Sequence, residues 1–176
     1  MPRTKSIDPT TDTGPGADLL NGPLKSAQIN IFKGMAAHPK VLEAFLGFSK
    51  GVKAGALSEA EHEVIALVSG QLRKCEYCTA AHTALGQKAG LSEDETVRIR
   101  EGKSEDPKRQ ALVSFTKAVI ETNGFVSDEQ LQSFRDAGYD DEAVIEVIAG
   151  IAVNTFTNLF NHVHETEVDF PVPASV

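Results

Sequence analysis

The sequence is punctuated at intervals by residues that end one α-helix and begin the next. Glycine is favoured just after a helix because it adopts left-handed backbone, and serine is favoured at the N-cap because its side chain accepts a free backbone N–H. Ala-Gly pairs close segments at residues 54–55, 89–90 and 137–138. The capping-box spacing, a serine three residues before Glu or Gln, occurs at Ser58, Ser92 and Ser127. No segment alternates convincingly with period two, so the chain is predicted to be all-α.

These signals divide the chain into about eight helices. Pro39 and Pro107 stand where a first helical residue is expected, the second of them after Asp106 as a cap. The predicted helices cover residues 23–36, 39–53, 59–72, 75–89, 93–101, 107–122, 128–136 and 141–165. The last of them is apolar nearly all round, which predicts the centre of the core or a subunit interface. Its polar exceptions, which need partners there, are Asn154, Asn158 and Asn161.

Length and composition indicate one domain. A chain of 176 residues is enough for one sizeable core. Residues 1–21 have no apolar stretch of the secretory type and are rich in Pro, Thr, Gly and Asp, so we expect a flexible lead without chemistry. Residues 22–176 are expected to form the single helical domain.

Charge and hydropathy exclude two classes of partner. The formal net charge is -8, and no run of Lys and Arg is present, which argues against nucleic acid or an anionic membrane surface. The apolar run over residues 143–156 is short for a membrane span and contains Glu146, Gly150 and Asn154. A helix buried in protein is therefore expected there.

Both cysteines of the chain lie in the stretch CEYCTAAH, residues 75–82. Cys75, Cys78 and His82 are spaced i, i+3 and i+7, which places two thiols and an imidazole on one helix face. A thiol attacks as thiolate, so a reactive cysteine needs a base or a positive potential nearby, and His82 is one turn from Cys78. Two cysteines three residues apart cannot staple a secreted fold, which favours a redox or metal pair in a reducing, cytoplasmic compartment.

Glu63 joins this cluster if the chain reverses direction near residues 72–74. In one continuous helix Glu63 would lie about 18 Å from Cys75. In an antiparallel pair, residues equidistant from the turn lie level, and the midpoint of Glu63 and His82 falls between Leu72 and Arg73. The carboxylate would then hold the imidazole that polarises Cys78.

Spacing leaves other interpretations open. Cys75, Cys78, His82 and Glu63 also supply four potential zinc ligands, although a structural zinc site normally draws on two segments. Inert packing of the thiols is a third interpretation. The remaining histidines are given no site role: His38 begins a helix, His62 points about 100° away from Glu63 toward a surface or interface, and His162 and His164 are solvated.

Glu63, eleven intervening residues and the C-x-x-C-x-x-x-H motif resemble the alkylhydroperoxidase D branch of the carboxymuconolactone decarboxylase family. The motif covers residues 59 to about 90, and the closing NTFTNLFNHVHETEVDFP is similar in style to peroxidase-related members. The resemblance implies an all-helical domain that forms trimers or hexamers. One departure is Tyr77, because the best-studied members have a histidine just before the second cysteine.

The resemblance also implies a chemistry. Cys78 would attack hydrogen peroxide or an organic hydroperoxide, and Cys75 would close a disulfide and meet a dithiol reductant. Glu63 and His82 would relay the proton, and no dissociable cofactor would be needed. The decarboxylase members lack the cysteine pair, so lactone decarboxylation is not expected. The alternatives are a zinc-binding structural or interaction module and a redox sensor on the same fold.

Overall fold

The computed structural model describes residues 1–176 and contains nine helices and no strand, which confirms the all-α prediction. Seven of the eight predicted helices are present within one residue at either end. The helices are α1 (Pro15–Asn21), α2 (Asn30–Met35), α3 (Pro39–Val52), α4 (Glu59–Leu72), α5 (Glu76–Lys88), α6 (Glu93–Arg100), α7 (Pro107–Glu121), α8 (Asp128–Asp136) and α9 (Asp141–His164).

The predicted caps form. The side chains of Ser58, Ser92 and Ser127 each accept the backbone N–H three residues on. In return, the backbone N–H of each serine donates to the side-chain oxygen of the Glu or Gln at that position. Asp106 and Asp140 cap α7 and α9 with the side chain alone, which accepts the backbone N–H of Arg109 and Ala143 respectively. Local sequence therefore sets where these helices begin, because each cap satisfies a donor that the helix leaves free.

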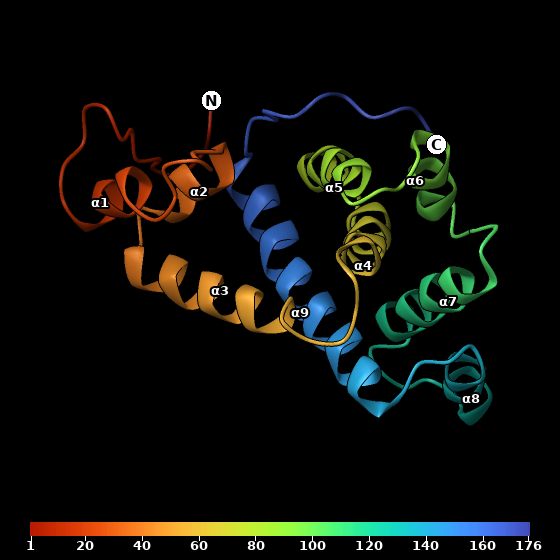
Figure 1. The fold of residues 1–176 in the computed structure, drawn as a ribbon. Helices are drawn as coiled ribbons and strands as arrows, with labels where there is room; N and C mark the ends of the chain where they lie inside the picture. Colours follow the sequence, from red (N-terminus) through yellow and green to blue (C-terminus); the bar gives the residue numbers. More distant parts are fainter.

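Helix α9 runs through the middle of the molecule and separates two groups of helices (Figure 1). On one side α4 packs against it, with α5, α6 and α7 around α4; on the other side α3 crosses it and carries α2 and α1. The larger apolar cluster surrounds α4, with Val64, Ile65 and Leu67 fully buried. The smaller cluster joins the N-terminal helices to the start of α5, and both cysteines belong to it.

Only one face of α9 is buried by the chain. Val147, Asn154 and Asn158 face inward, whereas Ile145 and Val163 are 68% and 63% exposed. Helix α9 is also the one helix long and apolar enough to cross a membrane by length and composition, and 44% of its most apolar window is buried here. A core helix passes the same test, and the inward face has that role in this structure.

Two predictions about the N-terminal region need correction. Residues 1–21 include helix α1, and Ile7, Ala17 and Leu20 are buried in the smaller cluster, so the segment is not a structureless lead. The prediction rests on the Pro, Thr and Gly content of this segment, whereas its three apolar side chains find their partners only in the folded chain. That residues 22–176 form a single domain stays a prediction.

The helix predicted over residues 23–36 is reduced to α2. Residues 23–29 form turns, and the α2 N-terminus is met by the C-terminal segment, where the Asn30 backbone N–H donates to Asp169 at 2.7 Å. A partner 139 residues away therefore supplies the acceptor that a local cap supplies elsewhere. Neighbouring residues could not reveal that partner.

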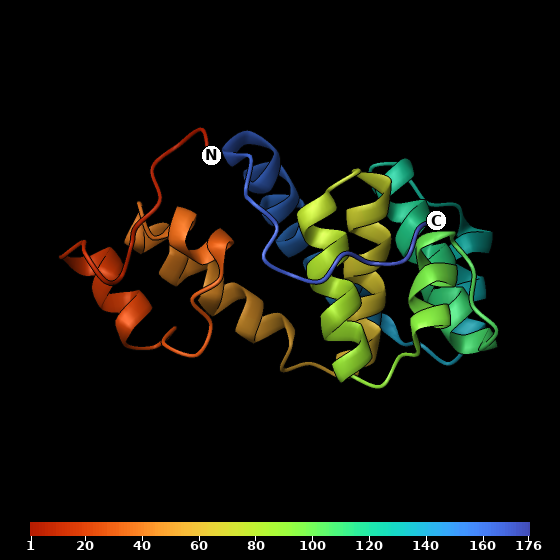
Figure 2. The same cartoon turned by 90° about the horizontal axis from the view of Figure 1, so that it is seen from above.

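After α9 the chain crosses α5 and ends beside α6 (Figure 2). Asn30 donates to the carbonyl of Glu167, and Arg100 donates to that of Ala174. Phe170 of this segment packs edge-on against Tyr77, with ring centroids 5.6 Å apart. The C-terminal segment therefore closes over the helix that carries the cysteines.

Candidate functional site

Helices α4 and α5 form the antiparallel pair that the sequence predicts. The chain reverses between Leu72 and Glu76, where Lys74 takes a left-handed backbone conformation with φ of 55°. Glu63 and His82 lie level across the pair, with Glu63 Oε2 2.7 Å from His82 Nδ1. The predicted turn and the predicted meeting of Glu63 with His82 are confirmed, although neither Gly nor Pro marks the turn.

The two cysteines lie at the N-terminus of α5 and are joined as a disulfide, with Cα atoms 5.3 Å apart. Cys75 is the N-cap, so the helix begins one residue later than predicted, and the Cys75 sulfur accepts the Cys78 backbone N–H at 3.3 Å. Cys75 is 1% exposed and Cys78 2%. A helix N-terminus carries partial positive charge, which favours a thiolate there.

Glu63 is a buried carboxylate that contacts two basic side chains. Its Oε1 lies 3.3 Å from Lys53 Nζ at the end of α3, and its Oε2 faces His82. Burial raises the pKa of the Glu63 carboxyl, but His82 and Lys53 together outweigh burial and bring the pKa below its usual value. Glu63 is therefore ionised at neutral pH and orients the imidazole.

His62 is not the surface or interface histidine that its helical position suggests. It is buried, with Nε2 3.0 Å from Glu146 Oε1 on α9. Glu146 also accepts the backbone N–H groups of Ala56 and Leu57. Burial lowers the pKa of His62 despite the neighbouring carboxylate. The prediction fails because α4 is covered by both α5 and α9, so a residue pointing 100° away from Glu63 is still inside.

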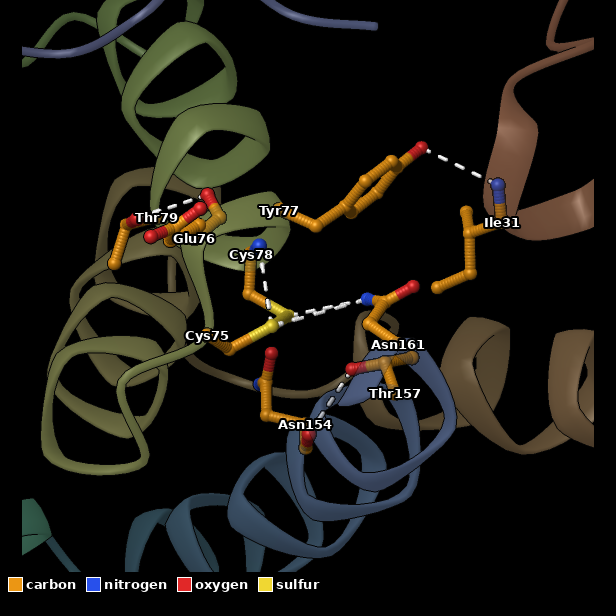
Figure 3. The surroundings of a disulfide bond; sticks show 9 residues. All are labelled: Ile31, Cys75, Glu76, Tyr77, Cys78, Thr79, Asn154, Thr157 and Asn161. Carbon is orange, nitrogen blue, oxygen red and sulfur yellow. Dashed lines mark hydrogen bonds between the residues drawn. A yellow bond between two sulfur atoms is a disulfide. The ribbon is translucent and has the colours of Figure 1, made fainter. Parts of the chain in front are cut away.

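Tyr77, the residue just before the second cysteine of the motif, points away from the sulfurs (Figure 3). Its hydroxyl oxygen lies 3.4 Å from the Ile31 backbone nitrogen, which donates to it. Burial, together with the Asp169 carboxylate, raises the pKa of Tyr77 above its usual range. The phenol stays protonated and joins α5 to α2 and the C-terminal segment.

Asn161 of α9 is a site residue that motif spacing does not identify. Its amide nitrogen lies 3.2 Å from Cys78 Sγ and 3.9 Å from Cys75 Sγ (Figure 3). The one available signal is the requirement that a buried amide on an apolar helix find a partner. Sequence could not say that the partner is the cysteine pair, 83 residues away.

The two cysteines face different hollows. Cys78 lines a mainly apolar cavity of about 190 Å³, together with Glu63, His82 and Lys53. Its apolar walls come from Ile29, Ile31, Phe32, Phe45, Leu46, Val52, Leu85, Val153 and Phe170. Cys75 lines a polar hollow of about 380 Å³ bordered by Lys74, Glu76, His162, Glu165 and Thr166. Tyr77 and Asn161 border both hollows and stand between them.

The side chains do not assemble a metal centre. No three His, Cys, Asp or Glu side chains come together as a group that could hold an ion, so the zinc interpretation finds no support in the geometry.

His38 is the N-cap of α3, as expected. His164, expected to be solvated, is 1% exposed and bonds to Thr4 and Ser6. That correction reflects the N-terminal segment, which covers the end of α9.

Comparisons with known proteins agree with this architecture. Residues 39–103 match the model of the carboxymuconolactone decarboxylase family, a stretch that contains α3 to α6 and the cysteine motif. The chain matches none of the curated proteins compared with it by sequence.

Solved structures show the fold. A peroxidase-related protein from Ralstonia eutropha with an alkylhydroperoxidase AhpD core has a TM-score of 0.85 and 18% identity, covering 96% of this chain and 92% of that one. A peroxidase-related protein from Silicibacter has a TM-score of 0.72 at 20% identity, covering 94% of each. The debrominase Bmp8, solved with 2,3,4-tribromopyrrole, has a TM-score of 0.69 at 21% identity, covering 80% and 76%.

Proposed function

We propose that this chain, which has the alkylhydroperoxidase D-like fold and a carboxymuconolactone decarboxylase family match over its α3–α6 region, is a thiol-dependent peroxidase. Its substrates would be hydrogen peroxide or organic hydroperoxides. The observation that carries the proposal is that Cys78, one half of a buried cysteine pair at a helix N-terminus, lines the same cavity as the Glu63–His82 pair.

The reaction needs only groups of the chain and an external dithiol. The Cys78 thiolate attacks the outer peroxide oxygen, so an S–O bond forms, the O–O bond breaks, and the leaving alkoxide or hydroxide takes a proton. His82, held by Glu63, is the proton donor and acceptor in this step. The Cys75 thiolate then attacks the sulfenic acid sulfur, so the S–S bond forms, the S–O bond breaks, and the expelled hydroxide takes a proton and leaves as water. A dithiol reductant resets the pair by thiol–disulfide exchange.

The two hollows support this division of roles. Cys78 faces the apolar cavity, which suits the organic part of a hydroperoxide. Cys75 faces the polar hollow, from which a reductant thiol would attack it. Peroxide would then approach the Cys78 thiolate and the reductant would approach the disulfide from opposite sides of the cysteine pair, with Tyr77 and Asn161 between them.

The cellular setting of the proposal follows from its chemistry. Reduction of the disulfide in every cycle requires a supply of dithiols, which favours the cytoplasm. The exposed apolar face of α9 supports a homo-oligomer. Neither nucleic acid nor a membrane is proposed as a partner, because the acidic chain offers no basic surface run.

The test is stoichiometric. The reduced protein, treated with one equivalent of cumene hydroperoxide or hydrogen peroxide, should lose two thiols per chain and form an intramolecular Cys75–Cys78 disulfide, detected by mass spectrometry after digestion. Metal content of the protein as purified is measured in parallel. Stoichiometric zinc without thiol loss, or only intersubunit disulfides, would contradict the proposal and favour the structural or sensor alternatives.

Reductive dehalogenation is a second candidate, favoured by the apolar cavity around Cys78. The dithiol supplies two electrons, the halogen leaves as halide, and the carbon takes a proton. Halide release from a brominated pyrrole, coupled to disulfide formation and exceeding the rate with peroxide, would favour this function over the first.

A further inference from the structure

The amide of Asn161 contacts the reacting sulfur from a helix that carries no part of the C-x-x-C motif. Its nitrogen is 3.2 Å from Cys78 Sγ, and the residue is 5% exposed. Figure 3 shows the amide directed at the two sulfurs from α9 while Tyr77 points elsewhere. Water therefore has little access to the contact, and a hydrogen bond shielded from water is stronger than an exposed one.

The orientation of this amide depends on the sulfurs. Asn161 Oδ1 is buried and has no hydrogen-bond partner, so Oδ1 is not what holds the side chain in place. A disulfide sulfur and a thiolate have only lone pairs to offer, which suit an N–H donor. A protonated thiol carries a hydrogen of its own and gains less from that donor. The contact therefore favours the ionised form of Cys78 over the protonated form.

The charged groups around the two hollows make no hydrogen bond to the Cys78 sulfur in this structure. The titratable and charged groups that line the Cys78 side are Lys53, His62, Glu63, Tyr77 and His82. Those on the Cys75 side are Lys74, Glu76, His162 and Glu165. The hydrogen bond to Cys78 Sγ itself comes from the neutral Asn161 amide. An uncharged donor acts in the same way across the pH range in which these groups titrate.

We propose that Asn161 is the thiolate-binding residue of this site, holding the Cys78 sulfur in its ionised form after the disulfide is reduced. The inference rests on the proposed thiol chemistry of Cys78. A second consequence is that the amide stabilises the reduced pair relative to the disulfide, which makes the pair more oxidising.

The experiment measures ionisation without peroxide. In a Cys75→Ser background, the alkylation rate of Cys78 by iodoacetamide is followed against pH, with and without Asn161→Leu. Leucine is close to asparagine in size and removes the donor. The pKa of Cys78 should rise by about 1 to 2 units, the shift expected for loss of a hydrogen bond to a charged group. In the two-cysteine protein, the potential measured against dithiothreitol should become more negative.

Asn158→Leu is the matched control. Asn158 lies one turn earlier on α9, is fully buried, and has no hydrogen-bond partner for either amide atom. Its replacement should leave the Cys78 pKa unchanged. If Asn161→Leu does not fold, Asn161→Ser tests the same contact with a smaller side chain whose hydroxyl can partly replace the amide, and it should give an intermediate pKa.

An unchanged pKa in the Asn161 variants, or an equal rise in Asn158→Leu, would overturn the assignment. Because no peroxide is present, this result is independent of whether the protein is a peroxidase. If the wild-type protein does not reduce peroxide but Asn161→Leu still raises the Cys78 pKa as expected, the proposed function alone would be contradicted.

Discussion

At the scale of single residues, the site depends on an imidazole held by a buried carboxylate. Glu63 accepts from both Lys53 and His82, and its ionisation is stabilised by them against the effect of burial. Cys78 and His82 are one helical turn apart on α5, whereas Cys75 lies before the helix. The two thiols therefore have different environments despite their closeness.

This difference predicts unequal consequences of removing either thiol. Cys78→Ser should abolish peroxide reduction, because the attacking sulfur is lost. Cys75→Ser should permit one turnover and then leave a sulfenic acid on Cys78, since nothing remains to resolve it. Dimedone labelling with mass spectrometry measures the sulfenic acid. Equal trapping in both variants would reject the assigned roles.

Glu63→Gln should slow peroxide reduction by about 10²- to 10⁴-fold with a much smaller effect on folding, because the amide cannot stabilise a protonated imidazole. The pH dependence of Cys78 alkylation should also change. Glu59→Gln, an exposed substitution one turn earlier on α4, is the control. Glu61, also nearby, is less suitable because it completes the Ser58 capping box and bonds to Tyr139. Wild-type rates in both the Glu63 and Glu59 variants would show that Glu63 has no catalytic role.

The same carboxylate predicts a pH dependence of stability. The folded-state pKa of Glu63 lies below the ordinary value of 4.5, so its stabilising contribution is complete above that pH. The contribution is lost as pH falls through the folded-state pKa. The difference in free energy of unfolding between wild type and Glu63→Gln should therefore shrink below about pH 4.5, as measured by urea titration at several pH values. A difference that grows on acidification would contradict this linkage.

At the scale of secondary-structure elements, the α4–α5 pair is the part on which the site depends. Its turn brings Glu63 opposite His82 and places Cys75 and Cys78 at a helix start. The turn relies on Lys74 in the left-handed region, which glycine adopts freely and L-residues other than Asn and Asp adopt with strain. The conformation is stabilised locally by the bond from the Cys75 backbone N–H to the Gly70 carbonyl at 2.9 Å.

Substitution at Lys74 should test this turn. Lys74→Val should be less stable than Lys74→Gly by roughly 1 to 2 kcal/mol, because a β-branched residue is strained at positive φ and glycine is not. Urea unfolding measures the difference. Lys50, exposed within α3, is the matched control, and there the order should reverse, since glycine is the poorer helix residue. The same order at both positions would contradict the left-handed turn.

At the scale of the whole molecule, one apolar face of the central helix remains uncovered. The exposed apolar side chains of α9 follow helical spacing: Ile145, Ile148, Phe156, Leu159 and Val163. Phe48 of α3 is half exposed and shares a surface hollow with Ile145. A continuous apolar surface of this kind typically marks a protein interface. The buried face of the same helix holds Glu146, Asn154 and Asn161 in place.

We expect this face to bind a second copy of the chain. Leu159→Glu should shift the protein to smaller species, because a charge in an apolar interface must be desolvated without a partner. Sedimentation velocity measures the change. Phe125→Glu is the control, since Phe125 is 88% exposed between α7 and α8 and belongs to neither α9 nor α3. A wild-type protein that sediments as a monomer would show that the face has another occupant.

The sequence alone determined most of the helices and the central pairing of the site. Capping boxes, Ala-Gly ends and helical periodicity are local, so they placed seven helices, and symmetry about a turn brought Glu63 to His82. The same reasoning failed for residues 1–36, where Leu20 and the Asn30 N-terminus find partners far along the chain.

Tertiary structure alone decided which polar residues enter the site. His62 is buried because α9 covers the second face of α4, and Asn161 meets Cys78 because α9 passes the start of α5. Tyr77 is turned away because α2 and the C-terminal segment bind its hydroxyl and ring. The two hollows on either side of the cysteine pair arise in the same way. Periodicity specifies which face of a helix a residue occupies, but the packing of distant elements determines what that face meets.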